Sequence, residues 1–419
     1  MVLFRNVTIT DSSSKYNGQT VDVLVNGHHI ESIAEAGSLS VDAAQVVEGG
    51  HLSPGWVDMR VYITDPGHEW KDDLESTAAS AAAGGFTRIL AMPNTAPALD
   101  NSGLIRALVM RSEALPVTIM PAGALSEGTQ GENLAELYDM HLAGAAAFTD
   151  GLHPTDSAGL LLRGLQYLKP FGSLLMDMPL DQSLNPGAEV GEGEVAIGLG
   201  MKGIPEIAEE LRIDRNLKLH GYFPHRLLVG PVTTAGALQR LANTEAEDLF
   251  VETSAMYLLL DDGALSSFDE NAKVFPPLRP AASVVALRKA VVDGTVDVIS
   301  SSHHPQGIEE KVHDFQNAAF GALMLETAFG AICTAMEGAE IGLDRLVDCI
   351  SGNPRRILGL DAATIEAGAA AELTHFDPNE SWEVSKADFR SKSANTPLIG
   401  KTLKGRPLGI YAKGQYLPR

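Results

Sequence analysis

Eight short apolar segments in the middle of the chain constrain the fold more than any other feature of this sequence. We predict that they are β-strands, at residues 56–63, 87–92, 117–122, 145–148, 173–178, 227–232, 249–254 and 296–301. Segments with the apolar spacing of helices lie between or after them, at 72–83, 132–142, 204–211, 320–335 and 343–350. Because eight strand–helix units that close on themselves form a (β/α)8 TIM barrel, the sequence predicts an α/β fold.

The two ends of the chain have the features of β-structure alone. Short strands are expected at 2–10, 21–25, 29–33, 372–376 and 408–411. Asn26-Gly27 is typical of a hairpin turn, and Asn353-Pro354 is expected to end the helical region before the last strands. Because neither end could bury a core by itself, we predict a small composite β-domain of residues 1–52 plus 365–419, beside a barrel of residues 53–364.

The charge of the chain limits its partners. The formal net charge is −23, and nucleic acids and anionic membrane surfaces bind basic proteins, so neither is expected as a partner. The first residues, MVLFRNVTIT, lack the pattern of a signal peptide, and no run of about 18 apolar residues could span a membrane. The expected location is the cytoplasm.

The first predicted barrel strand carries three polar side chains on one face. Asp58, Arg60 and Tyr62 alternate along the strand, so they are expected to point together into the barrel mouth, where such folds place their chemistry. A zinc hydrolase would require imidazoles at these positions, because neutral histidine is the usual nitrogen ligand of zinc. The chain has an arginine and a tyrosine there.

Several short motifs together resemble the dihydroorotase branch of the amidohydrolase superfamily. They are PGWVD (54–58), DPGHEWK (65–71), GGFT (84–87), MPNTAP (92–97), FTDG (148–151), PPLR (276–279), DGTVD (293–297) and SKSANTP (391–397). The resemblance covers nearly the whole chain and implies a TIM barrel of the metal-dependent hydrolase type with a composite β-domain. It also implies the opening or closing of a cyclic amide by a zinc-activated water.

The resemblance places the family's metal ligands on residues that are mostly unable to bind zinc. Its strand-one histidines fall on Arg60 and Tyr62, and its two later histidines fall on Met178 and Pro231. The position of its catalytic aspartate is occupied by Ser302, and only the bridging carboxylate is retained, as Asp150. No metal, no other cofactor and no catalytic residue is therefore expected at these positions.

The positions that hold the substrate in the family are also altered. Thr64 replaces an arginine, Phe275 an asparagine and Gln306 a histidine. Asn94, Arg279 and His303 remain as further residues of a residual pocket. His303 and His304 would face opposite ways on a strand, so they could not share a metal. His68 and His153 are loop histidines without an evident partner in the sequence.

Asp150 without a metal would be a poorly compensated charge. One hypothesis is that Arg60 replaces the metal as its counter-charge, directly or through Tyr62. The alternative is that Arg60 fills the cavity with its aliphatic stem.

Three functions are compatible with this pattern. The first is a catalytically inactive dihydroorotase-like protein of pyrimidine biosynthesis, which the resemblance implies would be a homo- or hetero-oligomeric partner of the catalytic chain of aspartate transcarbamoylase. The alternative is an active dihydroorotase, with a relocated metal or a metal-independent site that uses Asp150, Tyr62 and His303. The third is a ligand-sensing barrel, which requires an open polar pocket around Asn94 and Arg279.

Overall fold

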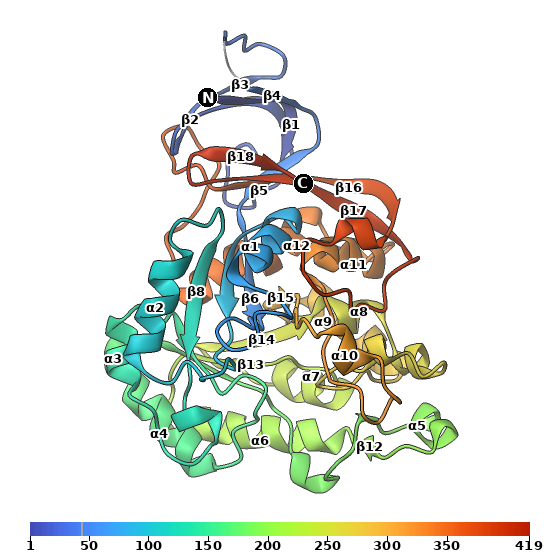
Figure 1. Ribbon diagram of the computed structural model, residues 1–419. Coiled ribbons are helices and arrows are strands. Elements are labelled where there is room, and N and C mark those ends of the chain that lie inside the picture. The colour runs from blue at the N-terminus through green and yellow to red at the C-terminus, as the bar shows by residue number, and fades with distance from the viewer. Residues whose placement is uncertain (43–44) are drawn as a thin grey trace.

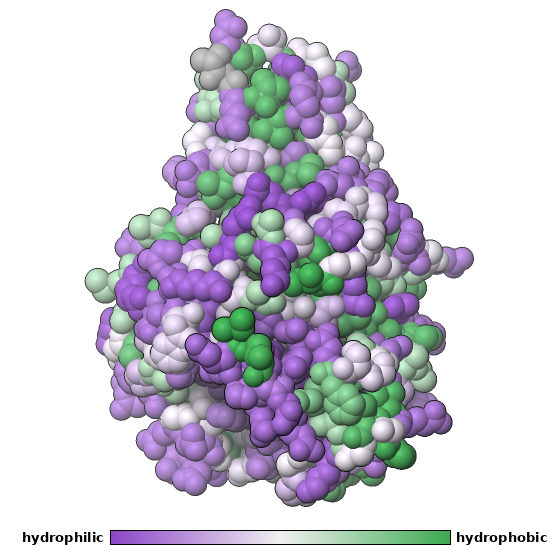
Figure 2. Space-filling model, turned by 45° about the vertical axis from the view of Figure 1, so that its right-hand side comes forward, coloured by the Kyte–Doolittle hydropathy of each residue, from purple (hydrophilic) through white to green (hydrophobic). Residues whose placement is uncertain are grey.

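A computed structural model describes residues 1–42 and 45–419. Its wider lower part is a barrel surrounded by helices, and its narrower upper part is a β-domain that contains both ends of the chain (Figure 1). The space-filling view shows the same wide lower part and narrow upper part (Figure 2). The predicted α/β barrel fold is confirmed. None of the described helices is long and apolar enough to cross a membrane.

One parallel sheet of eight strands forms the barrel, in the order β15-β14-β13-β10-β9-β8-β7-β6. The strands are β6 (Trp56–Val61), β7 (Phe86–Ala91), β8 (Thr118–Gly123), β9 (Ala147–Phe148), β10 (Leu174–Asp177), β13 (Leu227–Val229), β14 (Leu249–Ser254) and β15 (Val298–Ser300). Each lies within or next to a predicted apolar segment. A bridge between Val61 and His303, where the Tyr62 N–H donates to the His303 carbonyl at 2.8 Å, links the two ends of the sheet.

Helices cover the outside of the barrel (Figure 1). They include α1 (Leu74–Ala83), α2 (Ser102–Ser112), α3 (Leu137–Leu142), α4 (Ala158–Leu168), α6 (Ile207–Tyr222), α7 (Ala235–Ala242), α9 (Ala281–Asp293), α11 (Ala328–Ala335) and α12 (Leu343–Ile350). Helix α6 extends well beyond its predicted end at residue 211. Beyond residue 211 it buries Arg212, Asn216 and His220, which interrupt the apolar period that sequence analysis follows.

Three further predicted helix boundaries were wrong, and one of them is the start of the helix expected at 132–142, which begins only at Leu137, as α3. The helix expected at 320–335 begins only at Ala328, as α11. The break expected at Asn353-Pro354 lies earlier, at Ser351, and a new helix, α13 (Gly352–Leu358), begins there. Pro354 lies in the first turn of α13, where a missing N–H costs no helical hydrogen bond.

A second sheet combines strands from both ends of the chain, in the order β18-β17-β16-β5-β1-β2-β3, with β4 on β1. Its strands are β1 (Val2–Ile9), β2 (Thr20–Asn26), β3 (His29–Glu35), β4 (Gln45–Glu48), β5 (His51–Pro54), β16 (Leu373–Glu383), β17 (Thr402–Ala412) and β18 (Gln415–Pro418). Asn26 pairs with His29, so Gly27 and His28 form the hairpin turn, and Gly27 has a φ of 58°. The exact domain limits stay a prediction.

A partly buried carboxylate, 18% exposed, fastens the β-domain to the barrel. Glu372, just before β16, accepts hydrogen bonds from Arg88 of β7 (2.7 Å), Arg355 of α13 (2.7 Å) and the Thr87 hydroxyl (2.6 Å). Burial alone would raise the pKa of Glu372, but the two arginines and the hydroxyl outweigh it and lower that pKa to about 2. The ion pairs therefore favour the folded state in the pH range where Glu372 is ionised.

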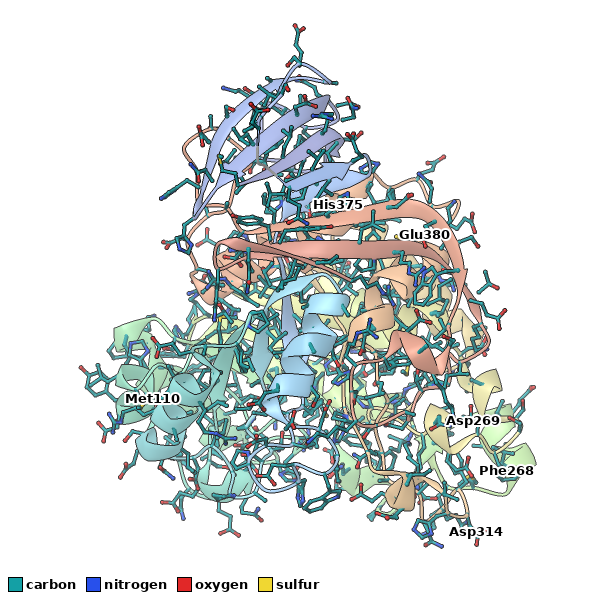
Figure 3. All side chains as sticks on the ribbon, turned by 45° about the horizontal axis from the view of Figure 1, so that its top comes forward. Met110, Phe268, Asp269, Asp314, His375 and Glu380 are labelled. Atoms are coloured by element: carbon teal, nitrogen blue, oxygen red, sulfur yellow. The ribbon has the colours of Figure 1, made fainter. Side chains whose placement is uncertain are left out.

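We expect Glu372→Gln to reduce the free energy of unfolding at pH 7 by roughly 3 kcal/mol, the equivalent of the pKa shift. The folded-state pKa lies below the ordinary value of 4.5. The stabilisation is thus complete above about pH 5, falls as the pH drops below 4.5 and is lost near pH 2. Urea unfolding of the wild-type chain and of the Glu372→Gln variant at pH 7 and pH 3 measures this stabilisation. Glu380→Gln is the control, since Glu380 of β16 (Figure 3) is 33% exposed and pairs with Arg406, so its loss should cost at most about 1 kcal/mol. Equal losses in the two variants would contradict the prediction.

Candidate active site at the barrel mouth

An ion pair fills the interior of the barrel below its mouth. Arg60 of β6 is 1% exposed, and its Nε and Nη2 donate to the two carboxylate oxygens of Glu252 on β14, at 2.9 and 2.6 Å. Nη2 also donates to the Gly230 carbonyl at 3.0 Å. Burial alone would lower the pKa of Arg60, but the charge of Glu252 outweighs it and raises that pKa, so the guanidinium is fully charged.

Arg60 therefore has a different partner from the one hypothesised. Asp150, which follows β9, accepts hydrogen bonds from the backbone N–H and the hydroxyl of Ser126, at 2.9 and 2.6 Å. Burial raises the pKa of Asp150 to about 6, although these two bonds oppose the shift. Two neutral donors from a neighbouring loop, not the arginine, thus compensate its charge, while Glu252 satisfies the guanidinium.

Asp58 and Tyr62, the other two residues predicted to share a face with Arg60, both hydrogen-bond to it and form a polar column with the Arg60–Glu252 pair. Asp58 accepts hydrogen bonds from the backbone N–H groups of Arg60 and Ser301, and burial raises its pKa to about 6. Tyr62 receives an N–H from Arg60 at 3.4 Å. Because a guanidinium only donates, the Tyr62 oxygen accepts there and its own hydrogen is free for another acceptor. Burial raises the pKa of Tyr62, so this hydrogen is present at neutral pH.

The residues at the family's metal positions do not fit a zinc ion. Arg60 contributes a fixed positive charge that is already neutralised by Glu252. Met178 is buried among Leu180, Ile204 and Ala208, and Pro231 has no donor atom in its side chain. Across residues 1–42 and 45–419, no three histidine, cysteine, aspartate or glutamate side chains converge in a way that could hold a metal. We therefore assign no chemical step to a metal at this site.

A cavity of about 460 Å³ opens at the mouth of the barrel. It is lined by Leu152 and His153 from the loop after β9, by Asp181, Gln182, Asn185, Pro186, Gly187, Ala188 and Ile204 from the segment after β10, and by Phe275, His304 and Phe320. A smaller cavity of about 20 Å³, enough for one water molecule, lies next to it and shares Phe275 and His304. Tyr62, Ser254, Ser301 and Ser302 also line the smaller cavity, so polar groups surround this space.

His304 is a neutral hydrogen-bond donor in this arrangement. Lys71 donates to the Gln306 amide oxygen at 2.9 Å, which orients the Gln306 amide nitrogen toward His304 Nε2 at 3.0 Å. Nε2 therefore accepts, and Nδ1 of the neutral ring carries the hydrogen. Burial, reinforced by nearby positive charges, lowers the pKa of His304 to about 3. The ring lies 4.8 Å from that of Tyr62, so two donors lie close together.

His153 has the complementary arrangement. Its Nδ1 lies 3.0 Å from the Thr129 carbonyl, which can only accept, so Nδ1 carries the hydrogen and Nε2 keeps a free lone pair. The Thr129 hydroxyl, 2.9 Å from Nδ1, donates its own hydrogen to the Gly128 carbonyl and thus accepts as well. A base and a donor therefore line the same cavity. The sequence analysis did not select either histidine as a site residue, although His153 follows the retained FTDG motif by only two residues.

The remaining candidate residues lie outside this cavity, apart from Phe275. His303 is fully buried, and its Nδ1 accepts from the backbone N–H groups of Met324 and Leu325. Ser302 has a φ of 53°, in the left-handed region. This conformation turns the chain so that the side chain of His304, and not that of His303, faces the cavity. The sequence analysis therefore selected the wrong one of the two for the mouth.

Three other residues predicted to line a residual pocket have structural contacts. Asn94 bonds to the backbone of Asp150 and Leu152, and the Thr64 hydroxyl donates to the Asp72 carbonyl. Arg279 is buried against Thr233 and the Ile204 carbonyl. Among the described residues, neither Asn94 nor Arg279 lines the cavity at the mouth, and Arg279 is only 2% exposed, so these two residues do not support a ligand sensor.

Comparisons with known proteins identify the family. The model of a protein family described as "Dihydro-orotase-like" matches residues 49–221. A protein named dihydroorotase from Geobacter metallireducens is 35% identical over 395 residues, which cover 92% of each chain. One of the same name from Pelobacter propionicus is 36% identical over 426 residues, covering 100% of this chain and 99% of that protein. The chain belongs to the dihydroorotase family.

Solved structures support the fold of this dihydroorotase relative. The L-hydantoinase (dihydropyrimidinase) from Arthrobacter aurescens superposes with a TM-score of 0.87 at 24% identity, covering 100% of this chain and 96% of that one. The dihydropyrimidinase from Brevibacillus agri superposes with a TM-score of 0.81 at 21% identity, with 100% and 95% coverage.

The relatives overturn the expectation of a catalytically inactive protein. Proteins that match more than nine tenths of the chain carry the name of an enzyme, dihydroorotase. The alternative, an active cyclic amidohydrolase with an atypical site, is therefore better supported than a non-enzymatic partner protein. These comparisons do not show that the chain belongs to the non-catalytic branch of the family.

Proposed function

We propose that the chain is a dihydroorotase with an atypical, metal-independent site, which opens and closes a cyclic amide in the mouth cavity. The observation that carries the proposal is the pair of histidines on one cavity, His153 with a free lone pair and His304 with a free N–H. The relatives named dihydroorotase supply the reaction class. Asp150 has no direct role, because Ser126 engages both of its oxygens.

In the ring-opening direction, a water molecule attacks the ring carbonyl carbon. His153 Nε2 takes a proton from that water, and the oxygen of the tetrahedral intermediate accepts hydrogen bonds from the Tyr62 hydroxyl and His304 Nδ1–H. The carbon–nitrogen bond then breaks, and the leaving nitrogen takes the proton back from His153. Ring closure follows the same steps in reverse and releases the water.

The cavity contributes shape more than charge to substrate binding. Phe275 and Phe320 contact each other edge to face, with their ring centroids 5.6 Å apart, and form an apolar wall for a flat ring. Among the described lining residues there is no lysine or arginine, so the Gln182 amide and backbone N–H groups are the donors for a substrate carboxylate.

The test is turnover by the purified full chain with dihydroorotate and with carbamoyl-aspartate, with metal analysis of the same sample. We expect ring opening and closure at the same rate before and after treatment with excess chelator. Stoichiometric zinc, with activity lost on chelation, would mean that a relocated metal performs the reaction. An absence of turnover with both compounds, in a folded and pure sample, would contradict the proposed function.

Association with aspartate transcarbamoylase and a cytoplasmic location stay predictions from the resemblance and the composition. We propose the association as an addition to the enzyme activity, not as its replacement. Co-sedimentation of the two purified proteins at micromolar concentration tests it, and separate sedimentation would contradict it.

A further inference from the structure

A second large cavity, of about 410 Å³, lies in the β-domain. It forms where β16, β17 and β18 meet the short helix η7 (Lys386–Asp388), and Glu380 marks its place in Figure 3. Its charged lining residues are Glu380, Asp388, Arg390, Arg406 and Arg419. We call it the arginine cavity. Three arginines against two carboxylates give its lining a net charge of +1, in a chain whose net charge is −23.

Arg406 engages both acids of the arginine cavity. Its Nη1 donates to Glu380 at 2.7 Å, and its Nη2 donates to Asp388 Oδ1 at 3.1 Å. The other oxygen of Asp388 accepts from the backbone N–H and the hydroxyl of Ser385, at 2.9 and 2.8 Å. The two carboxylates therefore already have partners, and Arg390 and Arg419 supply the excess positive charge.

The guanidinium of Arg419 lacks hydrogen-bond partners. Its side chain is 9% exposed, and among the residues that the structure describes neither Nη1 nor Nη2 has an acceptor. Asp388 Oδ1 lies 3.6 Å from Nη2, which is too long for a hydrogen bond. Arg419 and Arg406 both lie over the Trp382 ring, 4.6 and 4.8 Å from its centroid, and this packing holds them in place.

The charge of Arg419 is incompletely compensated as a result. Burial, reinforced by the charge of Arg406, lowers the pKa of Arg419 to about 10, although Asp388 and Glu326 oppose the shift. Glu326 is 1% exposed and does not line the arginine cavity. An anion in the cavity would stabilise the buried guanidinium, because an opposite charge favours its charged form.

Arg390 provides an accessible donor at the same cavity. It is exposed, and its Nη1 donates to the Ala387 carbonyl at 3.1 Å. Glu326 accepts the backbone N–H of Arg390 at 2.9 Å, so that acid engages the main chain. Within residues 1–42 and 45–419, the Arg390 guanidinium pairs with no carboxylate, and it remains free to contact a ligand.

We propose that the arginine cavity binds a small anion that carries a phosphate group, which Arg390 contacts directly and Arg419 attracts from the cavity wall. A guanidinium suits phosphate because its planar fork donates two parallel hydrogen bonds. Pro407, Leu408 and Pro418 add apolar walls beside the arginines, so an organic group attached to the phosphate would also find contacts.

The charge of the whole chain favours a small ligand over a large one. A nucleic acid would bring many phosphates against a protein with a net charge of −23, whereas a single phosphate meets mainly the local positive charge of the cavity. The mouth cavity has no lysine or arginine among its described lining residues, so it offers a phosphate no such site. The proposal concerns the β-domain and does not depend on activity at the barrel mouth.

Isothermal titration calorimetry of the full chain, at a fixed ionic strength of about 0.15 M, tests the proposal. The probes are inorganic phosphate and phenyl phosphate. We expect binding with a Kd of about 1 mM or lower. Tighter binding of phenyl phosphate would identify a phosphate ester as the ligand, and equal binding would identify free phosphate. An absence of binding by both probes at tenfold the expected Kd would overturn the proposal.

Variants locate the binding. Arg390→Ala should weaken it about 10-fold, the usual effect of a lost charge-assisted hydrogen bond. Arg419→Ala should weaken it more than Arg419→Lys, which keeps the positive charge. Arg163→Ala is the matched control, because Arg163 is also an exposed arginine but lies on α4, and this variant should bind as the wild-type chain does.

Thermal unfolding shows whether each variant is folded. Arg390 is exposed, so its replacement tests the cavity even if changes at Arg419 disturb the packing on Trp382. Wild-type binding by Arg390→Ala would overturn the proposal. Equal losses of affinity in Arg390→Ala and Arg163→Ala would do the same, since they would indicate a general effect of charge and not a site.

Discussion

Replacement of Arg60 with methionine is expected to reduce the free energy of unfolding at pH 7 by about 3 to 5 kcal/mol. The substitution removes both guanidinium hydrogen bonds to Glu252, whose side chain is fully buried. A carboxylate left unpaired in the barrel interior must then either stay charged at a large desolvation cost or take up a proton. Urea unfolding of the variant beside the wild-type chain measures the loss.

The double variant Arg60→Met, Glu252→Met separates charge pairing from packing. With both charges removed, the side chains can pack as apolar residues of similar volume, and such replacements of buried ion pairs are often close to neutral. We therefore expect the double variant to be more stable than Arg60→Met alone. If Arg60→Met cost less than about 1 kcal/mol, the ion pair would not be the feature that holds the barrel interior together.

Replacement of His153 with alanine is expected to lower kcat for ring opening by about 10² to 10⁴, the usual contribution of a general base. The side chain is exposed at the cavity, and its hydrogen bonds among the described residues go to Thr129, so the stability of the fold should change little. KM should change less than kcat, because proton transfer to Nε2 occurs in the transition state. Steady-state kinetics with dihydroorotate, together with thermal unfolding, distinguishes loss of the base from loss of the fold.

His29→Ala is a suitable control for this variant. His29 is an exposed histidine at the hairpin of the β-domain, on the far side of the fold from the barrel mouth. The His29→Ala variant should retain the wild-type kcat. A His153→Ala variant with less than a threefold loss of kcat would mean that another group accepts the proton, and the assignment of the base would then be wrong.

The altered metal positions and the retained family membership are compatible if the chemistry has moved to other side chains. Sequence identity of 34 to 37% extends over more than nine tenths of the chain, so the barrel and its loops are retained. The column of Asp58, Arg60 and Glu252 occupies the interior with a self-contained ion pair. The polar side chains of His153, His304 and Tyr62 line the cavities above it.

The sequence alone was sufficient for the architecture, because the signals of that architecture are local. Apolar segments of strand length and the helical periods between them predicted all eight barrel strands to within a few residues. The alternation of Asp58, Arg60 and Tyr62 predicted one shared polar face, and the structure joins Arg60 to Tyr62. The failures at 320–335 and Asn353-Pro354 concern where a helix starts, which depends on hydrogen bonds beyond the local pattern.

Only the tertiary structure decided the contacts of the site. Arg60 pairs with Glu252, 192 residues away, because β6 and β14 direct these side chains to the same point inside the closed barrel. His304, not His303, faces the cavity because Ser302 takes a left-handed conformation. Such choices depend on which strands become neighbours and on how one residue rotates the backbone. A one-dimensional pattern records the residue types and their spacing, whereas their partners are fixed only when the barrel closes.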